Sequence, residues 1–434
     1  MDWKSEYKNF LLILGFFLFA YFMPVDSELF RNSIIDAFAL AKWYAQEHVL
    51  LCLVPAFFIA GVIAVFISQT AVIKYLGAKT NKIKAYLIAS VSGTILAVCS
   101  CTVLPLFSSI HKKGAGLGPA IAFLYSGPAI NILAIILTAR ILGFELGVAR
   151  VIGAVSFSLL IGLIMAFIYR DEEKEKADAQ LLLPEIDDQK PFWMTATHFF
   201  ILVAILVFVN WGKPASSTEG FWYFIYANKW YFTSVLGVAF SISLIYIVGV
   251  KLIYVIAGLV AVVLSAIIFS GNTLIPFIVA VIATTIALTY TEGEANQWLG
   301  ETWGFTKQII PLLGAGVLVA GFLFGSPDGK GGIIPDNLVF KLVGGNSIFS
   351  NLFASIVGAF MYFATLTEIP ILQGLINNGM GKGPALALLL AGPALSLPNM
   401  LVIRSVIGTQ KTFVYVSLVV IMATISGLIY GELF

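Results

Sequence analysis

Two cysteines separated by a single residue are the most reactive groups in the sequence. They stand in Cys99-Ser100-Cys101-Thr102, with Pro105 three residues further on. On a regular helix, residues two apart point about 200° away from each other, whereas an unwound backbone can bring both sulfurs to one side. Two thiolates suit a soft centre such as trivalent arsenic bearing one methyl group. The alternative is that both cysteines are small apolar packing residues.

A zinc site does not fit the rest of the sequence. Structural zinc takes four protein ligands and catalytic zinc at least three. Besides the pair, the chain has one further cysteine, Cys52, and three scattered histidines, His48, His111 and His198. We therefore predict no metal site and no cofactor.

An internal repeat provides the cysteine segment with a counterpart. Residues 102–131 align without a gap onto residues 367–396, at a constant offset of 265, and 12 of the 30 positions are identical. The shared frame includes Thr102/Thr367, Pro105/Pro370 and Gly127-Pro128/Gly392-Pro393. Identities in one register predict that the chain contains two related structural units.

Proline and glycine in these segments predict interrupted helices. Proline lacks a backbone N–H, and glycine permits conformations that other residues avoid. Interrupted backbone at membrane depth is tolerated only inside protein or beside a water-filled cavity, and its occurrence at matching places in two halves points to a transporter's substrate site. We expect the breaks at Pro105, Gly127, Pro128, Pro370, Gly392 and Pro393 to line the site. Bending for packing alone is the alternative.

Glu368 stands in the second unit at the position that Val103 occupies in the first. A carboxylate within an apolar span is costly, so it suggests a proton carrier or a cation contact. The alternative is a surface position at the end of the segment. The side-chain amides of Asn131 and Asn399 can hydrogen-bond either to backbone carbonyls freed by the helix breaks or to the substrate. The predicted substrate-binding residues are Cys99, Ser100, Cys101, Thr102, Asn131, Thr367, Glu368 and Asn399, with Glu368 as the candidate for proton coupling.

The composition identifies the class of protein. Of 434 residues, 59% are hydrophobic and 11% charged, and the mean hydropathy is +0.97. These values exclude soluble enzymes, and a net charge of +2 does not favour nucleic acid as a partner. We predict an all-α polytopic membrane protein. Apolar segments long enough to cross a bilayer, which takes roughly 20 residues, lie near 8–24, 48–70, 85–107, 116–139, 148–169, 193–212, 230–249, 252–270, 273–290, 305–325, 347–375, 383–404 and 411–431.

A charged tract divides these segments into two halves. We predict an N-terminal transmembrane half at 1–169 with the first repeat at about 48–169, a charged cytoplasmic linker at 170–191, and a C-terminal half at 192–434 with the second repeat at about 305–434. If 85–107 and 347–375 are re-entrant, the repeats are inverted and the excess of Lys and Arg on the cytoplasmic side grows. We prefer this arrangement to one in which all segments cross.

The motifs also resemble a known family. Cys99-Ser100-Cys101 leading into Leu104-Pro105-Leu106, and Ser126-Gly127-Pro128-Ala129-Ile130-Asn131 after it, are similar to the predicted permeases of the YraQ/ArsP-like group, which includes methylarsenite efflux permeases. The resemblance covers most of the chain. It implies a multi-pass permease of the prokaryotic inner (cytoplasmic) membrane, with the cysteine pair as the candidate site for trivalent organoarsenicals and a role in arsenical resistance.

These observations predict a secondary transporter, not an enzyme, that exports a small soft or thiol-reactive solute. The chain has no Walker-type Gly-x-x-x-x-Gly-Lys-Ser/Thr motif, so an ion gradient or a separate partner supplies the energy. The alternative is a membrane-embedded thiol redox or sulfur-relay protein with a thioredoxin-like partner. A third reading is an ion channel. The expected partners are the solute and the lipid bilayer, and the sequence leaves homo-oligomer formation open.

Overall fold

A computed structural model describes most of the chain. The described residues are 3–67, 69–77, 80–96, 100–130, 135, 138–139, 141–181, 191–212, 220–326, 332–334, 342–361, 368–377 and 379–434. Three of the predicted site residues, Cys99, Asn131 and Thr367, lie outside them. Ser100, Cys101 and Pro370 are described through their backbone.

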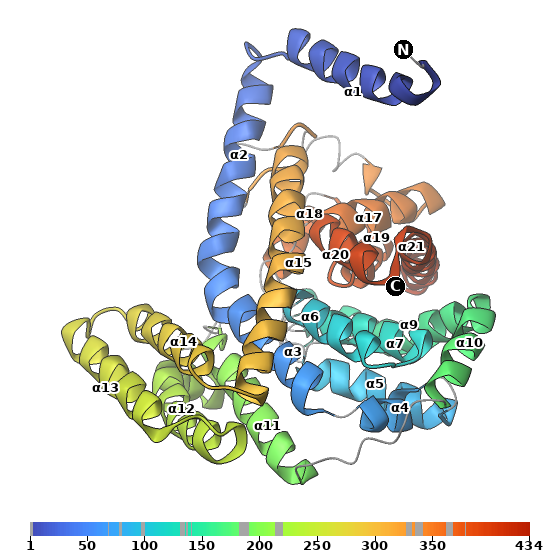
Figure 1. Ribbon diagram of the computed structural model, residues 1–434. Coiled ribbons are helices and arrows are strands. Elements are labelled where there is room, and N and C mark those ends of the chain that lie inside the picture. The colour runs from blue at the N-terminus through green and yellow to red at the C-terminus, as the bar shows by residue number, and fades with distance from the viewer. Residues whose placement is uncertain are drawn as a thin grey trace.

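The described chain is helical, as predicted (Figure 1). Within these residues the only β interaction is an isolated bridge between Gly344 and Met380. The α-helices are α1 Trp3–Tyr21, α2 Glu28–Tyr44, α3 Val54–Phe66, α4 Gln69–Leu76, α5 Lys82–Leu96, α6 Ser100–Lys112, α7 Leu117–Ala129, α9 Phe144–Ile168, α10 Arg170–Leu181, α11 Phe192–Val209, α12 Phe221–Ser243, α13 Leu252–Ile268, α14 Leu274–Thr289, α15 Glu294–Phe324, α17 Ile348–Phe360, α18 Glu368–Asn377, α19 Lys382–Ala391, α20 Leu397–Ile407 and α21 Thr409–Leu433, with π-helical segments at Ala45–Leu53 and Leu244–Val248.

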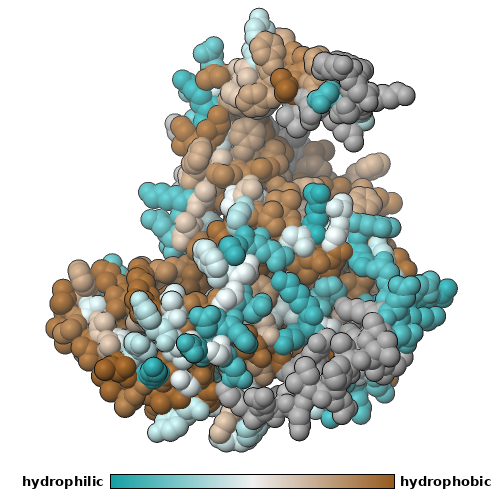
Figure 2. Space-filling view, viewed as in Figure 1, coloured by the Kyte–Doolittle hydropathy of each residue, from teal (hydrophilic) through white to brown (hydrophobic). Residues whose placement is uncertain are grey.

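Among the described residues, five helical stretches are long and apolar enough to cross a membrane. They are Glu28–Phe66, Phe144–Ile168, Phe221–Val248, Glu294–Phe324 and Thr409–Leu433, each of at least 25 residues. Helices α12, α13 and α14 expose many large apolar side chains, and the brown surface at the lower left of Figure 2 lies over them. Such a surface suits contact with lipid, so the chain is a polytopic helical membrane protein.

The first long span begins earlier than the sequence predicted. Instead of starting near residue 48, the helix begins at Glu28 and continues through the π-helical segment to Phe66. Ser33 and Asp36 interrupt the apolar run, yet both are buried. They lie on α2, which runs along α15 (Figure 1). Hydropathy started the predicted span too late because it cannot show that a neighbouring helix shields polar residues.

The segments predicted to be interrupted do contain more than one helix. Residues 85–107 contain the end of α5 and the start of α6, and 347–375 contain α17 and the start of α18. Residues 383–404 are divided between α19 and α20, while α7 ends at Ala129, well before residue 139. The breaks shorten these helices to between 10 and 15 residues.

The offset of 265 residues found in the sequence recurs in the helices. Helices α9 and α21 both have 25 residues and begin and end at equivalent positions. The turns after α6 and α18 each contain a glycine in the left-handed region, Gly114 with φ 102° and Gly379 with φ 100°. Only glycine adopts this conformation readily. The repeated unit therefore extends beyond residues 102–131 and 367–396.

The two units also share one close helix contact. A Cβ added to Gly162 of α9 would lie 2.7 Å from the carbonyl oxygen of Gly118 in α7. A Cβ added to Gly427 of α21 would lie at the same 2.7 Å from the carbonyl oxygen of Gly383 in α19. Small residues let helix backbones approach closely within a membrane. Both pairs of helices are therefore packed through equivalent glycines.

The charged linker is partly helical and contacts both halves of the chain. Helix α10 follows α9 after a single residue, and its Glu173 carboxylate accepts a hydrogen bond of 2.9 Å from the backbone N–H of Leu117, at the start of α7. The neighbouring Glu172 pairs with Lys411 of α21. The linker thus connects the N-terminus of α7 with the C-terminal half.

The glycine contacts lead to a stability prediction. Gly162→Ala and Gly427→Ala should each lower the free energy of unfolding by about 1–3 kcal/mol, because the added methyl group overpacks against backbone. Thermal unfolding of the purified protein in detergent measures the effect. Gly237→Ala in α12 is the matched control, since a Cβ there meets nothing within 4 Å. Midpoints equal to that of Gly237→Ala in both variants would contradict the packing argument.

Candidate functional site

An arginine is completely buried in the apolar helix α9. The side chain of Arg150 has 0% exposed surface, although the helix around it is among the five membrane-spanning candidates. A guanidinium group stays protonated in proteins, so its burial requires a counter-charge. The span predicted from the sequence began at 148, which placed Arg150 at the end of the helix, where a charged side chain can reach water. In the structure the helix begins at Phe144, so Arg150 lies inside it.

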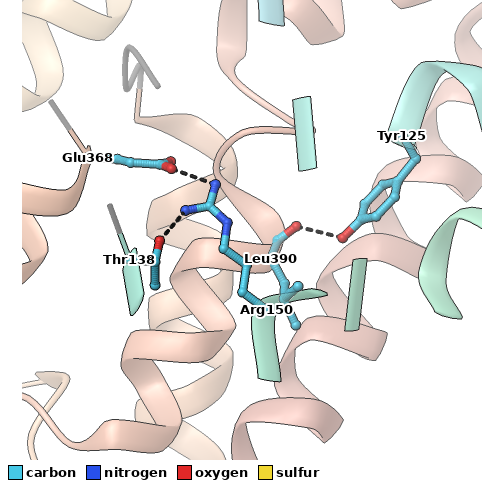
Figure 3. A network of polar contacts seen from close by, with 5 residues as sticks. All are labelled: Tyr125, Thr138, Arg150, Glu368 and Leu390. Carbon is cyan, nitrogen blue, oxygen red and sulfur yellow. Dashed lines mark hydrogen bonds and ion pairs between the residues drawn. The ribbon is translucent and has the colours of Figure 1, made fainter. Parts of the chain in front are cut away.

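Glu368 of α18 supplies the counter-charge (Figure 3). The Nη2 atom of Arg150 lies 2.6 Å from Oε1 of Glu368, whose side chain is 1% exposed. The Nη1 atom donates a hydrogen bond of 2.9 Å to Oγ1 of Thr138. Glu368 is also the first residue of its helix, where the helix dipole favours a carboxylate. The surface position that the sequence left open for Glu368 is therefore excluded.

A tyrosine extends this polar cluster toward α19. The hydroxyl of Tyr125 in α7 donates a hydrogen bond of 2.8 Å to the carbonyl oxygen of Leu390 (Figure 3). Tyr125 also interacts electrostatically with Arg150 and with Tyr415 of α21. Both tyrosines are fully buried. The cluster therefore joins helices from both halves of the chain.

Several polar atoms of the cluster have unused bonding capacity. The Nε atom of Arg150, the Oε2 atom of Glu368 and the hydroxyl of Tyr415 have no hydrogen-bond partner among the described residues. A buried polar atom without a partner costs about 1–3 kcal/mol. These atoms are consequently available to a bound solute, ion or water.

The cysteine segment lies at the start of a helix. Ser100 and Cys101 are the first two residues of α6, and Thr102 follows in the same turn with a buried side chain. Val103, the counterpart of Glu368, is buried as well. Asn399 occupies the first turn of α20, where its N–H lies 3.3 Å from Ser396 Oγ, and its side chain is buried. Its Oδ1 atom has no hydrogen-bond partner among the described residues.

The prolines do not all lie where the sequence predicted breaks. Pro105 is inside α6, Gly127 and Pro128 are in the last turn of α7, and Pro370 is in the first turn of α18. Helix α6 therefore continues through Pro105, whereas α7 ends one residue after Pro128 and α18 begins two residues before Pro370. Proline is tolerated in a first turn because the N–H groups there have no helical partner. Within α6, Pro105 leaves the carbonyl of Cys101 without the usual N–H four residues later.

The second Gly-Pro pair does mark the end of a helix. Gly392 is the residue that caps the C-terminus of α19, and its N–H donates to the carbonyl of Leu388 at 2.8 Å. Pro393 follows outside the helix, and α20 begins four residues later, at Leu397. The helix is therefore interrupted at this Gly-Pro pair, where the sequence predicted a break.

Breaking the buried ion pair should destabilise the fold. Glu368→Gln or Arg150→Met alone should lower the free energy of unfolding by about 3–5 kcal/mol, because each leaves a buried group without its partner. The double variant Arg150→Met/Glu368→Gln should regain most of this loss. Denaturant unfolding of the purified protein measures all three variants.

An exposed ion pair serves as the matched control. Glu145 lies 3.8 Å from Lys382, and both side chains are 56% exposed. Glu145→Gln should therefore change stability by no more than about 1 kcal/mol. Equal effects of Glu145→Gln and Glu368→Gln would contradict a special role for the buried pair.

Comparison with known proteins agrees with this membrane architecture. A family described as predicted permeases, of the ArsP type, matches residues 34–432. The UPF0718 protein MJ0584 of Methanocaldococcus jannaschii is 40% identical over 402 residues, or 92% of this chain and 94% of that protein. The UPF0718 protein YraQ of Escherichia coli is 31% identical over 145 residues, covering 32% of this chain and 37% of YraQ. No solved structure matches the chain. Because the family match spans nearly all the helices, the chain belongs to the ArsP-type family of predicted permeases.

Proposed function

We propose that this permease is a secondary transporter of the prokaryotic inner membrane that exports a small soft or thiol-reactive solute, such as a trivalent organoarsenical. The observation that carries the proposal is the ion pair of Arg150 and Glu368, fully buried between helices of the two halves. Ionisable groups at such places in membrane proteins mark solute and proton pathways.

Glu368 is the proton-coupling residue in this proposal. Its carboxylate is held by a single contact from Arg150, at Oε1, and the other oxygen has no hydrogen-bond partner among the described residues. Protonation would remove the charge that compensates Arg150, and the pair would separate because an uncompensated buried cation is costly. A proton can in this way change the packing of α18 against α9.

Cys99, Ser100 and Cys101 form the solute site in this proposal. The backbone of α6 begins at Ser100, so Cys101 lies in the first turn of a helix and Cys99 directly precedes it. A helix N-terminus favours negative charge, and the thiolate is the form of cysteine that binds soft electrophiles. Thr102, Asn131, Thr367 and Asn399 complete the proposed lining.

The contact of Tyr125 with Leu390 supports a two-fold relation between the repeats. These residues are 265 positions apart and are therefore counterparts of each other. Two equivalent positions can touch only close to the axis that relates them. We propose inverted repeats, with 85–107 and 347–375 re-entrant and the 170–191 linker cytoplasmic. Transport would then proceed by movement of one repeat against the other.

Uptake of methylarsenite into everted membrane vesicles tests the proposal. Vesicles with the wild-type protein should accumulate it when a proton gradient is imposed, and Cys99→Ser/Cys101→Ser should reduce accumulation to the level of empty vesicles. Cys52→Ala is the matched control, because Cys52 is buried in the π-helical segment Ala45–Leu53 and has no role in the proposed site. It should transport as the wild type does.

Other outcomes would point to the alternatives. A fully active Cys99→Ser/Cys101→Ser variant would refute the thiol role. Capture of a mixed disulfide with a thioredoxin-like protein, without methylarsenite flux, would favour the redox alternative. Flux that does not saturate with solute concentration would favour a channel.

A further inference from the structure

The buried arginine makes fewer hydrogen bonds than its guanidinium group can donate. A guanidinium has five N–H donors in a planar fork. In Arg150, Nη1 bonds to Thr138 and Nη2 contacts one oxygen of Glu368, while Nε has no hydrogen-bond partner among the described residues. The Nε and Nη2 atoms lie on the same edge of the group, which binds two oxygens of one anion in bidentate pairs. Glu368 thus engages only one of these two donors, and no described residue uses Nε.

A second positive element converges on the same place. Helix α18 has 10 residues and begins at Glu368. The first N–H groups of a helix have no helical acceptors, and together with the dipole they attract anions. Glu368 is the first residue of α18, so its carboxylate meets the guanidinium near the N-terminus of that helix.

The surroundings offer no other negative charge in the described part of the chain. The titratable groups around Arg150 there are Glu368 from α18, Tyr125 from α7 and, beyond it, Tyr415 from α21. Phenols are neutral at physiological pH. When Glu368 is neutral, the cation of Arg150 therefore has no counter-charge from these groups.

We propose that Arg150 and the N-terminus of α18 form a binding site for a small monovalent oxyanion, which the Glu368 carboxylate fills in this structure and vacates when it is neutralised. Thr138 holds the guanidinium in place through Nη1, so Nη2 remains directed at the carboxylate of Glu368 (Figure 3). One negative charge matches the charge of Arg150, and the oxygens of an oxyanion can accept hydrogen bonds from its guanidinium N–H groups. The protein would accordingly take up an anion together with a proton.

This inference shares Glu368 with the proposed function but does not require the cysteines or transport of an arsenical. The two can therefore fail separately. If thiol-dependent export is wrong, the purified protein is still expected to bind the anion. If the anion does not bind, thiol-dependent export is unaffected.

Thermal unfolding in nitrate tests the site. The purified variants Glu368→Ala and Arg150→Met/Glu368→Ala are compared with the wild type at pH 7.5, in sodium nitrate and in sodium gluconate of equal ionic strength. Glu368→Ala removes the carboxylate and leaves room for a planar anion. Its unfolding midpoint should rise with the logarithm of the nitrate concentration, because a ligand that binds the folded state stabilises it by mass action. The double variant and the wild type should show no such rise.

A pH arm keeps the test decisive if Glu368→Ala does not fold. Nitrate should raise the midpoint of the wild type more at pH 5 than at pH 7.5, since protonation of Glu368 opens the site, and Arg150→Met/Glu368→Ala should not respond at either pH. An equal nitrate effect at both pH values, or the same effect in the double variant, would overturn the proposal. Chloride stabilising Glu368→Ala as much as nitrate would overturn the assignment of an oxyanion.

Discussion

The ion pair between Arg150 and Glu368 is the interaction that constrains the centre of this protein. Transferring either charge alone into an apolar interior costs several kcal/mol, and only a close partner offsets that cost. One partner lies on α9 in the N-terminal half and the other on α18 in the C-terminal half. The two halves must therefore assemble together. Because both side chains are excluded from water, a change in either charge acts on the packing of both halves.

The helices around this pair are positioned by glycine contacts that occur twice. Gly162 lies against Gly118, and Gly427 lies against Gly383, so α9 and α21 each approach their neighbours at backbone distance. The backbone is repeated, but the charges are not. The counterpart of Arg150 is Tyr415, and the counterpart of Glu368 is Val103. Each repeat thus contributes one charge to a shared cluster, which a symmetric duplication of side chains would not produce.

Some features of the site followed from local sequence rules and others did not. The cost of a carboxylate in an apolar segment correctly pointed to Glu368 as a buried residue. The same rule applies to Arg150, but an error of four residues in the predicted start of α9 hid it. Pro105 was a false signal for a break, because α6 continues through it. Helix ends depend on which backbone groups find partners in the fold, and residue type alone does not show this.

The sequence by itself determined the helical membrane class, the repeat at an offset of 265 and the segments in which helices are interrupted. These properties depend on hydropathy, spacing and the geometry of proline and glycine, which are written in neighbouring residues. Only the tertiary structure decided that Arg150 pairs with Glu368, that Tyr125 meets Leu390, and that Ser33 and Asp36 lie inside a long helix. The physical reason is that a polar group can be buried only when the opposing surface satisfies it, and that surface comes from distant parts of the chain.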